Sequence, residues 1–198
     1  MPLLQHAFAA YRKMVGMEIK SFLAGVAFSA LLLIAAILIA NAITSPPCAQ
    51  ATPLFSPDAS DEIISMMREA KETIEVEMYV FTDDALAREL SDAQKRGVQV
   101  RVILEGRVNS KASTQTIPAA LEAAGVQVRW ASLQYALTHS KMMIIDGKKV
   151  LIGSINFSKS AQHKNREAAA VLECPEDASQ YSEVFEKDWK DAMEIAPS

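Results

Sequence analysis

The chain has 198 residues, 50% of them hydrophobic, and a formal net charge of −4 at pH 7. This length accommodates one domain of ordinary size plus a targeting segment, and the negative charge argues against a uniformly basic nucleic-acid binder. The charge is uneven, because residues 139–166 hold six Lys or Arg and one Asp, whereas residues 173–194 hold eight acids and two Lys. We therefore expect a local basic patch followed by an acidic, solvated helix face.

The first 51 residues predict a signal peptide or a signal anchor. Residues 22–40 are an almost unbroken apolar run, and three basic residues precede them. This order keeps the N-terminus in the cytoplasm and directs the following chain outward. The small-x-small pattern at residues 49–51 favours cleavage, whereas the apolar run is also long enough to span a bilayer. Residues 52–198 are then exported, either free in the periplasm or anchored to the inner membrane outside the cytoplasm.

The chain has two cysteines, Cys48 and Cys174. Cleavage after Ala51 would leave Cys174 alone in the mature chain. Neither a disulfide framework nor a cysteine metal cluster is then expected in residues 52–198.

Hydrophobic periodicity predicts alternating helices and strands in residues 52–198. Ser56 followed by Pro57 is typical of a helix start, with Ser as the cap, and Gly97 is typical of a helix end. In chain order, the sequence predicts a helix from residue 56, a strand at 74–81, a helix at 82–97, a strand at 98–104, a loop at 107–115, a helix at 116–125, strands at 126–130, 138–145, 150–155 and 169–172, and a last helix at 176–193.

Strands that alternate with helices predict an α/β fold, a mixed β-sheet sandwiched by helices, after the N-terminal hydrophobic helix. Asp146-Gly147 is a strong turn signal and makes the flanking strands a hairpin. On the last helix we expect a buried side made of Tyr181, Val184, Phe185 and Trp189.

The polar residues of this hairpin form the pattern H-x-K-x4-D-x6-G-S-x-N. Each of its polar side chains can attack, hold or neutralise a phosphate. A chain this short matches six fixed positions by chance about once in several hundred thousand sequences, so the usual false-positive risk of a motif is small. The residues of the pattern are His139, Lys141, Asp146, Gly153, Ser154 and Asn156.

His139 and Lys141 are the candidate catalytic pair. Two positions apart on a strand, they point to the same face, about 7 Å from each other. The imidazole supplies a nitrogen nucleophile that is partly neutral near pH 7, and the ammonium neutralises a non-bridging phosphate oxygen.

The other residues of the pattern divide into ligands and supports. Ser154 and Asn156 can donate hydrogen bonds to phosphate oxygens, and Gly153 lets the backbone come close. Asp146 lies on the face opposite His139 and is expected to be structural, organising the turn rather than acting as an acid or base.

This pattern resembles the HKD motif of the phospholipase D superfamily, whose members cleave and transfer phosphodiesters through a phosphohistidine intermediate. The single copy resembles the one-motif, Nuc-like branch of bacterial endonucleases. Residues 75–83, 96–104 and 165–167 also look like segments of the family, and the resemblance extends over residues 55–189. The family's fold is likewise an α/β sandwich.

The resemblance implies roles for the segment that follows the motif. Glu167 matches the family's carboxylate that orients the catalytic histidine and stabilises its cation. Asn165 is expected to shape the pocket, and His163 and Lys164 to contact substrate at its rim.

The mechanism that the resemblance implies needs two imidazoles, one to attack phosphorus and one to protonate the leaving oxygen. Either two chains meet with their motifs face to face, or His163 supplies the second imidazole within one chain. Resemblance to the one-motif branch favours a two-fold homodimer in which both His139 residues share one site.

The leading hypothesis is a metal-independent endonuclease of low sequence specificity, acting on DNA, with RNA as an alternative substrate. No cofactor is implied, and the acids near the motif lack the spacing of zinc or magnesium ligands. One alternative is a lipid phosphodiesterase acting on cardiolipin, with membrane contact if the N-terminal segment stays uncleaved. Another is a catalytically dead protein that binds phosphate or DNA.

Overall fold

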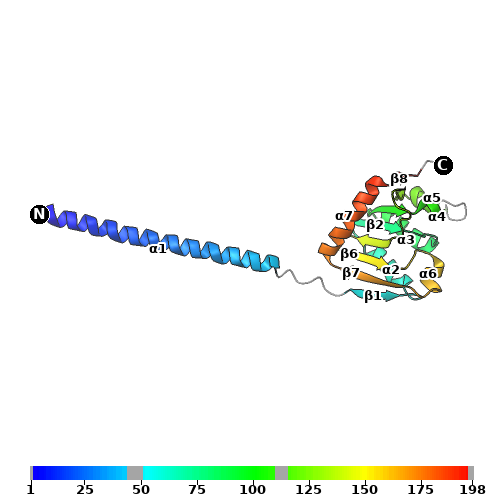
Figure 1. Ribbon diagram of the computed structural model, residues 1–198, viewed down its shortest axis with the longest axis horizontal. Helices are drawn as coiled ribbons and strands as arrows, with labels where there is room; N and C mark the ends of the chain where they lie inside the picture. Colours follow the sequence, from blue (N-terminus) through cyan, green and yellow to red (C-terminus); the bar gives the residue numbers. More distant parts are fainter. Residues whose placement is uncertain (1, 44–50, 110–115, 196–198) are drawn as a thin grey trace. The chain divides into compact units, whose positions relative to one another are not determined.

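The computed structural model describes residues 2–43, 51–109 and 116–195 of the chain. It consists of two compact units, Met1–Pro47 and Cys48–Ser198. The first unit contains the helix α1 (Pro2–Ile43), drawn in blue in Figure 1. Its stretch His6–Ile37 is long and apolar enough to cross a membrane by length and composition, a property that a signal sequence shares with an anchor.

The second unit is a mixed β-sheet with helices on both faces, which confirms the predicted fold class (Figure 1). The strands are β1 (Thr52–Phe55), β2 (Thr73–Met78), β3 (Gln99–Leu104), β4 (Gln127–Trp130), β5 (Lys141–Ile145), β6 (Lys149–Gly153), β7 (Ala168–Glu173) and β8 (Met193–Glu194), and the helices are α2 (Ser60–Glu69), α3 (Asp84–Lys95), α4 (Gly106–Asn109), α5 (Thr116–Ala123), α6 (Lys159–His163) and α7 (Pro175–Asp191).

The strands lie in the order β1-β7-β6-β5-β2-β3-β4-β8. The pairs β2–β3 and β3–β4 are parallel, and the other neighbours are antiparallel. β2 is therefore the strand where the parallel and antiparallel halves meet, and its antiparallel neighbour β5 carries the motif. This register brings Met78, at the end of β2, opposite Lys141, at the start of β5.

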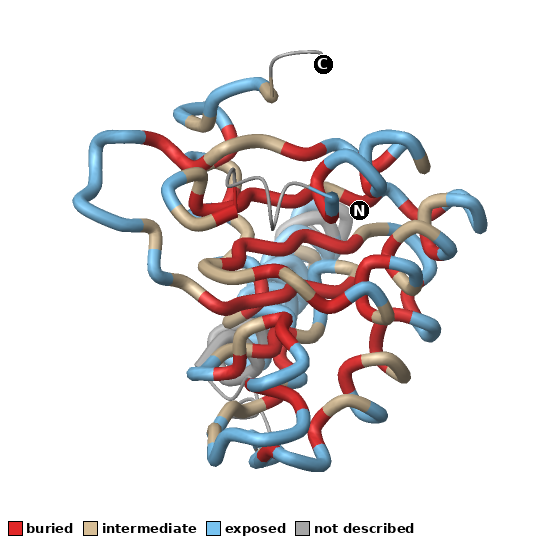
Figure 2. Tube along the Cα trace, turned by 90° about the vertical axis from the view of Figure 1, so that its right-hand side faces the viewer, coloured by how far each residue is buried: buried red, intermediate tan, exposed pale blue. Residues whose placement is uncertain are grey.

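Each face of the sheet has its own apolar core. On one face α2, α3 and α5 pack over the strands, with Ile63, Leu90 and Leu121 among the buried side chains. On the other face α7 packs Phe185 and Trp189 against the sheet. Figure 2 shows the consequence, central strands that are buried almost throughout. Because both faces are covered, the central strands carry apolar runs rather than a simple polar alternation.

Ser56 does not cap the first helix of the domain, contrary to the prediction. α2 begins later, at Ser60, after Ala59, which makes no side-chain capping bond. Ser56 is fully buried instead. Its hydroxyl donates to the carbonyl of Asn165 (2.7 Å) and accepts from the backbone N–H of Glu167 (2.8 Å). A long-range contact has taken the hydroxyl that the local pattern assigned to a cap.

Other differences are smaller. The predicted loop at 107–115 starts inside the short helix α4, and its residues 110–115 lie outside the described part of the chain. Val184, expected on the buried side of α7, is 54% exposed, because that side is taken by Phe185 and Trp189. The short edge strands β1 and β8 were not predicted.

Cys174 lies at the start of the last helix of the domain. It caps α7, where its sulfur accepts from the backbone N–H of Asp177 (3.3 Å), and it is almost fully buried. It is disulfide-bonded in the full-length chain.

Glu77 of β2 is a buried carboxyl group, only 2% exposed, and its Oε2 forms no hydrogen bond with any described residue. Burial raises the pKa of Glu77 to about 7, opposed by a hydrogen bond from Ser140 and reinforced by the carboxyl of Asp188 on α7. The neutral form is therefore favoured in the folded protein below about pH 7.

Glu77 is therefore expected to make stability fall as pH rises. Because its folded pKa lies above the ordinary value of 4.5, its contribution is complete below pH 4.5 and is lost as pH rises through about 7. The expected loss is at most about 3 kcal/mol. Glu77→Gln, which cannot ionise, should be the more stable protein at pH 8 in urea unfolding. Glu122→Gln, at an exposed position, is the control. If the free energy of unfolding changed with pH equally in all three proteins, the expectation would be contradicted.

Candidate active site

His139 lies just before β5 rather than on it, because the strand begins at Lys141. Its imidazole is solvent-exposed and packs on the ring of Tyr79, with centroids 4.3 Å apart and planes tilted by 58°. The expected pairing of two side chains on one strand is thus replaced by a loop residue next to a strand residue. The imidazole is open to a substrate on one side and supported on the other.

Lys141 is the buried partner of this pair, 8% exposed. Its ammonium donates to the backbone carbonyl of His139 (2.7 Å) and lies 4.9 Å from the centroid of the Tyr79 ring. Burial lowers the pKa of Lys141, and the carboxylate of Glu167 acts in the opposite direction. A positive charge is therefore held against the backbone of the candidate nucleophile and beside the ring on which its imidazole packs.

Tyr79 was missed by the sequence reasoning although its ring supports both candidate catalytic residues. The sequence pattern that could have indicated Tyr79 is the alternation of the predicted strand, which places Tyr79 on the same face as Glu75 and Glu77. What the sequence did not supply was the pairing of β2 with β5, which brings Tyr79 and His139 together.

Glu167 belongs to a short chain of hydrogen bonds at the end of the motif. It accepts from the hydroxyl of Ser154 (2.6 Å) and from the side-chain amide of Asn165 (2.9 Å). The bonds from Ser154 and Asn165, followed by the charge of Lys141, lower the pKa of Glu167, so the carboxylate stays ionised near neutral pH. Within the described part of the chain no hydrogen bond joins Glu167 to His139, and its role as orienter stays a prediction.

Asn156 ties the end of the motif to the end of β2. Its Oδ1 accepts from the backbone N–H of Val80 (3.2 Å), and its backbone carbonyl accepts from the side chain of Gln162 (3.1 Å). Because the carbonyl of the amide is engaged, the amide is fixed in orientation. Its NH2 group makes no hydrogen bond with the described residues and can donate to a phosphate oxygen.

Asp146, whose structural role stays a prediction, contacts the backbone that leads into β2. Its carboxylate accepts the backbone N–H groups of Lys71, Glu72 and Thr73, at distances between 2.7 and 3.1 Å. Partial burial raises the pKa of Asp146, but these three backbone donors outweigh it and lower the pKa. The aspartate thus anchors the hairpin turn to the start of β2.

Gly153, predicted to be a structural residue of the motif, lies against the neighbouring strand β7. A Cβ at this position would lie 2.4 Å from the carbonyl oxygen of Ala168 and 2.6 Å from the Cβ of Ala169. The neighbouring strand β7 leaves no room for any side chain.

Gly153→Ala is therefore expected to destabilise the fold by about 3 kcal/mol or more, because backbone atoms must move apart. Thermal unfolding of the two proteins measures the loss. Gly147→Ala, at a turn glycine with no atom near the position of a Cβ, has only its positive φ to accommodate and should cost less; equal losses would contradict the steric account.

His163 and Lys164 lie at the end of α6 and its C-cap, both exposed. His163 lines a small cavity of about 120 Å³ with Pro57, Asp58, Ser60 and Asp61, beside the start of α2. No contact between His163 and His139 is found among the described residues. The site that the motif assembles thus contains His139, Lys141, Ser154, Asn156, Asn165 and Glu167, whereas His163 lines the cavity beside α2.

No group of three or more His, Cys, Asp or Glu side chains that could hold a metal ion occurs in the described ranges. The positive charge at the site is supplied by a protein ammonium, that of Lys141.

An α/β sandwich that places one H-x-K-x4-D-x6-G-S-x-N hairpin beside the central strand defines an HKD-motif protein. The family model described as "Cardiolipin synthase, PLD-like domain" matches residues 63–189. The chain therefore belongs to the phospholipase D superfamily, as a member with a PLD-like domain.

Curated relatives include a "Phospholipase D" of Rickettsia bellii, 37% identical over 112 residues, which cover 57% of this chain and 54% of the relative. A "Mitochondrial cardiolipin hydrolase" of Danio rerio is 27% identical over 144 residues, 73% of this chain and 63% of the relative. The chain thus matches less than two thirds of the length of either relative.

Solved structures of similar fold include the phospholipase D family member Nuc from Salmonella typhimurium, with a TM-score of 0.71 and 28% identity. It matches 75% of this chain and 99% of its own. NucT from Helicobacter pylori, at 24% identity and a TM-score of 0.69, shares the fold and covers 74% of this chain and 99% of its own. Both comparisons leave about a quarter of this chain unmatched.

Proposed function

We propose that the protein is a metal-independent phosphodiesterase, and specifically an endonuclease of low sequence specificity acting on DNA, with RNA as an alternative substrate. The observation that carries the proposal is the pairing of an exposed imidazole with a buried ammonium. His139 is open to substrate, and the Nζ of Lys141 is held against its backbone 2.7 Å away. A nucleophile and a fixed positive charge at one point are what attack on an anionic phosphodiester requires.

In the proposed reaction a ring nitrogen of His139 attacks phosphorus, and the bond to the leaving oxygen breaks. A second imidazole gives that oxygen its proton. Water, deprotonated by the same second imidazole, then attacks the phosphohistidine and releases a phosphomonoester and free His139. Lys141 neutralises a non-bridging oxygen in both steps, while Asn156 and Ser154 donate hydrogen bonds and Glu167 orients an imidazole.

The second imidazole is proposed to be His139 of another copy of the chain, in a two-fold homodimer. His163, the alternative in the same chain, lines the cavity beside Asp58 and Asp61 at the start of α2. A shared site needs only that the exposed faces around the two His139 rings meet.

Nucleic acid suits the charge distribution near the site. Lys164 and Arg166 are exposed on the segment that carries Glu167, and the Arg166 guanidinium lies over the Phe55 ring, 5.3 Å from its centroid. Basic side chains beside the motif can follow a phosphate backbone without reading its sequence.

A lipid phosphodiesterase is the second candidate, supported by a different observation. Three large apolar side chains, Leu133, Tyr135 and Leu137, are 44–64% exposed in the segment directly before His139. Exposed apolar groups next to a site are a feature of membrane-contacting surfaces. The apolar helix α1 would keep such a surface near a bilayer if it stays uncleaved.

Export of residues 52–198 is also a proposal, supported by the apolar helix α1. Cleavage near residues 49–51 and retention as an inner-membrane anchor are distinguished by N-terminal sequencing of the protein purified from the cell envelope and from the soluble periplasm.

The activity is tested by incubating the full-length protein, in detergent, with plasmid DNA in excess EDTA, beside His139→Ala. Degradation by the wild type alone supports a metal-independent nuclease acting through His139. Intact DNA but hydrolysed cardiolipin in vesicles would replace the nuclease with the lipid phosphodiesterase. Binding of DNA without turnover of either substrate would indicate a dead site.

A further inference from the structure

Glu105 is a buried charged residue outside the motif. It follows β3 directly and is 1% exposed. A carboxylate at this depth requires partners, because an unpaired buried charge is strongly destabilising. Glu105 receives the backbone N–H of Arg107 (2.9 Å), the Nη1 of Arg107 at 3.1 Å from each oxygen, and the backbone N–H of Thr138 (2.8 Å).

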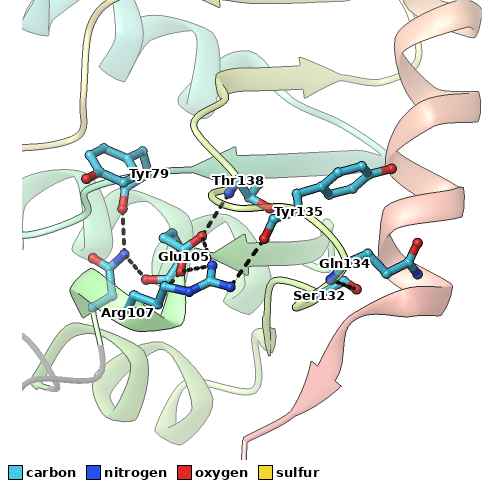
Figure 3. A network of polar contacts seen from close by, with 8 residues as sticks. Tyr79, Glu105, Arg107, Ser132, Gln134, Tyr135 and Thr138 are labelled. Carbon is cyan, nitrogen blue, oxygen red and sulfur yellow. Dashed lines mark hydrogen bonds and ion pairs between the residues drawn. The ribbon is translucent and has the colours of Figure 1, made fainter.

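The bond from Thr138 fixes the backbone immediately before His139. The chain between β4 and β5 forms neither helix nor strand, and its residues 133–137 are all exposed. Arg107 adds a second tether, since its Nη2 donates to the carbonyl of Tyr135 (3.2 Å). Figure 3 shows Glu105 between Arg107 and Thr138, with Tyr135 beyond the guanidinium.

The backbone of Tyr79, whose ring packs on the imidazole, is hydrogen-bonded to the same segment, residues 105–109. Asn109, at the end of α4, donates to the backbone carbonyls of Tyr79 (2.7 Å) and Glu105 (2.9 Å) and accepts from the backbone N–H of Phe81 (2.9 Å). The Tyr79 ring is the one that packs on His139. Residues 105–109 therefore hold both the backbone before His139 and the residue whose ring packs on its imidazole.

We propose that Glu105 is a positioning residue for His139, acting through Thr138 and Arg107 to hold the imidazole in line with phosphorus. The carboxylate is buried and does not reach substrate; it holds the segment 133–138 in one conformation. In-line attack is sensitive to small displacements, and a shift of about 1 Å can lower a rate 100-fold. The proposal rests on the proposed function only in taking His139 as the nucleophile.

The test uses the full chain in detergent with a chromogenic bis(nitrophenyl) phosphodiester, and compares Glu105→Ala with Glu75→Gln. Glu75 is the matched control because it is another buried glutamate paired with an arginine, Arg101, but on the α7 side of β2. We expect kcat of Glu105→Ala to fall about 10- to 100-fold, with KM within about threefold of wild type. The assay temperature is kept well below the unfolding midpoint of the variant. In Glu75→Gln, kcat should stay within about threefold of wild type.

Imidazole NMR gives a readout that a purely stabilising role would not change. The His139 signal, assigned by its absence in His139→Ala, should broaden or shift in Glu105→Ala and stay in place in Glu75→Gln. A kcat decrease below about fivefold, or an equal decrease in both variants, would overturn the proposal.

If Glu105→Ala does not fold, kcat of Arg107→Met decides instead, and a decrease below about fivefold would again overturn the proposal. Its side chain is 38% exposed, and its loss removes the tether to Tyr135 while leaving the bond from Thr138. Failure of the proposed function is a separate result, because wild type and His139→Ala would then turn over the substrate equally.

Discussion

Mixing wild-type chains with His139→Ala chains is expected to yield heterodimers with almost no activity. One imidazole would attack and the other would donate the proton, so a heterodimer lacks one half of the only site it can form. In a fully exchanged equal mixture only the wild-type pairs, about one quarter of the dimers, would be active, whereas independent sites would preserve about one half of the activity. Loss of a catalytic nucleophile should lower the homodimeric variant's rate by about 10⁴-fold or more.

The measurement is the activity of heterodimers isolated with two different affinity tags, after exchange in mild denaturant and refolding. His163→Ala is the decisive comparison, because a second imidazole from the same chain would make it as inactive as His139→Ala. Heterodimers that retain half the wild-type activity would disprove the shared site.

The sequence was sufficient for the architecture because the sheet is covered on both faces and its strands carry the matching apolar runs. The structural role of Asp146 stays a prediction, which its contacts support. Parity placed this residue opposite His139, and the structure shows its carboxylate on the backbone of residues 71–73. Local patterns therefore predicted the helices and strands, which follow from hydrophobic periodicity, and the hairpin turn, which follows from its residues.

Contacts between segments far apart in the sequence could not be predicted from local patterns. Ser56 has the composition of a helix cap, yet its hydroxyl contacts a segment more than 100 residues away in sequence. The reason for a glycine at position 153 is of the same kind, because the backbone of β7 excludes a side chain there. In both cases the neighbouring residues belong to a strand or segment whose position depends on sheet order.

The same reason explains the supporting residues of the site. Tyr79 follows β2 and Glu105 follows β3. These two strands pair in parallel with each other, and β2 also pairs with β5. The carboxyl ends of β2 and β3 meet at one edge of the sheet, and β5 runs antiparallel to them, so its first residue arrives at that edge. The position of His139 is thus determined by three strands, only one of which carries the motif.

Replacing Lys141 with Met is expected to lower kcat about 100- to 1,000-fold, because the charge that neutralises a non-bridging oxygen is removed. The fold should survive, since the methionine keeps the length of the apolar stem in a buried position. Lys148→Met removes the same charge from an exposed position of the same hairpin and should leave kcat within about threefold of wild type.

The pH profile gives an independent measure of the same charge. The ammonium is the active form, and burial, which disfavours a charged group, lowers the pKa of Lys141 from its ordinary value of 10.5. Wild-type kcat should therefore decline on the alkaline side before pH 10.5. Lys141→Arg, whose guanidinium stays protonated throughout this range, should be slower but should lack that decline. A wild-type profile that is flat to pH 10.5, together with a Lys141→Met variant of near-normal kcat, would show that the ammonium supports the loop at His139 without acting on the phosphate.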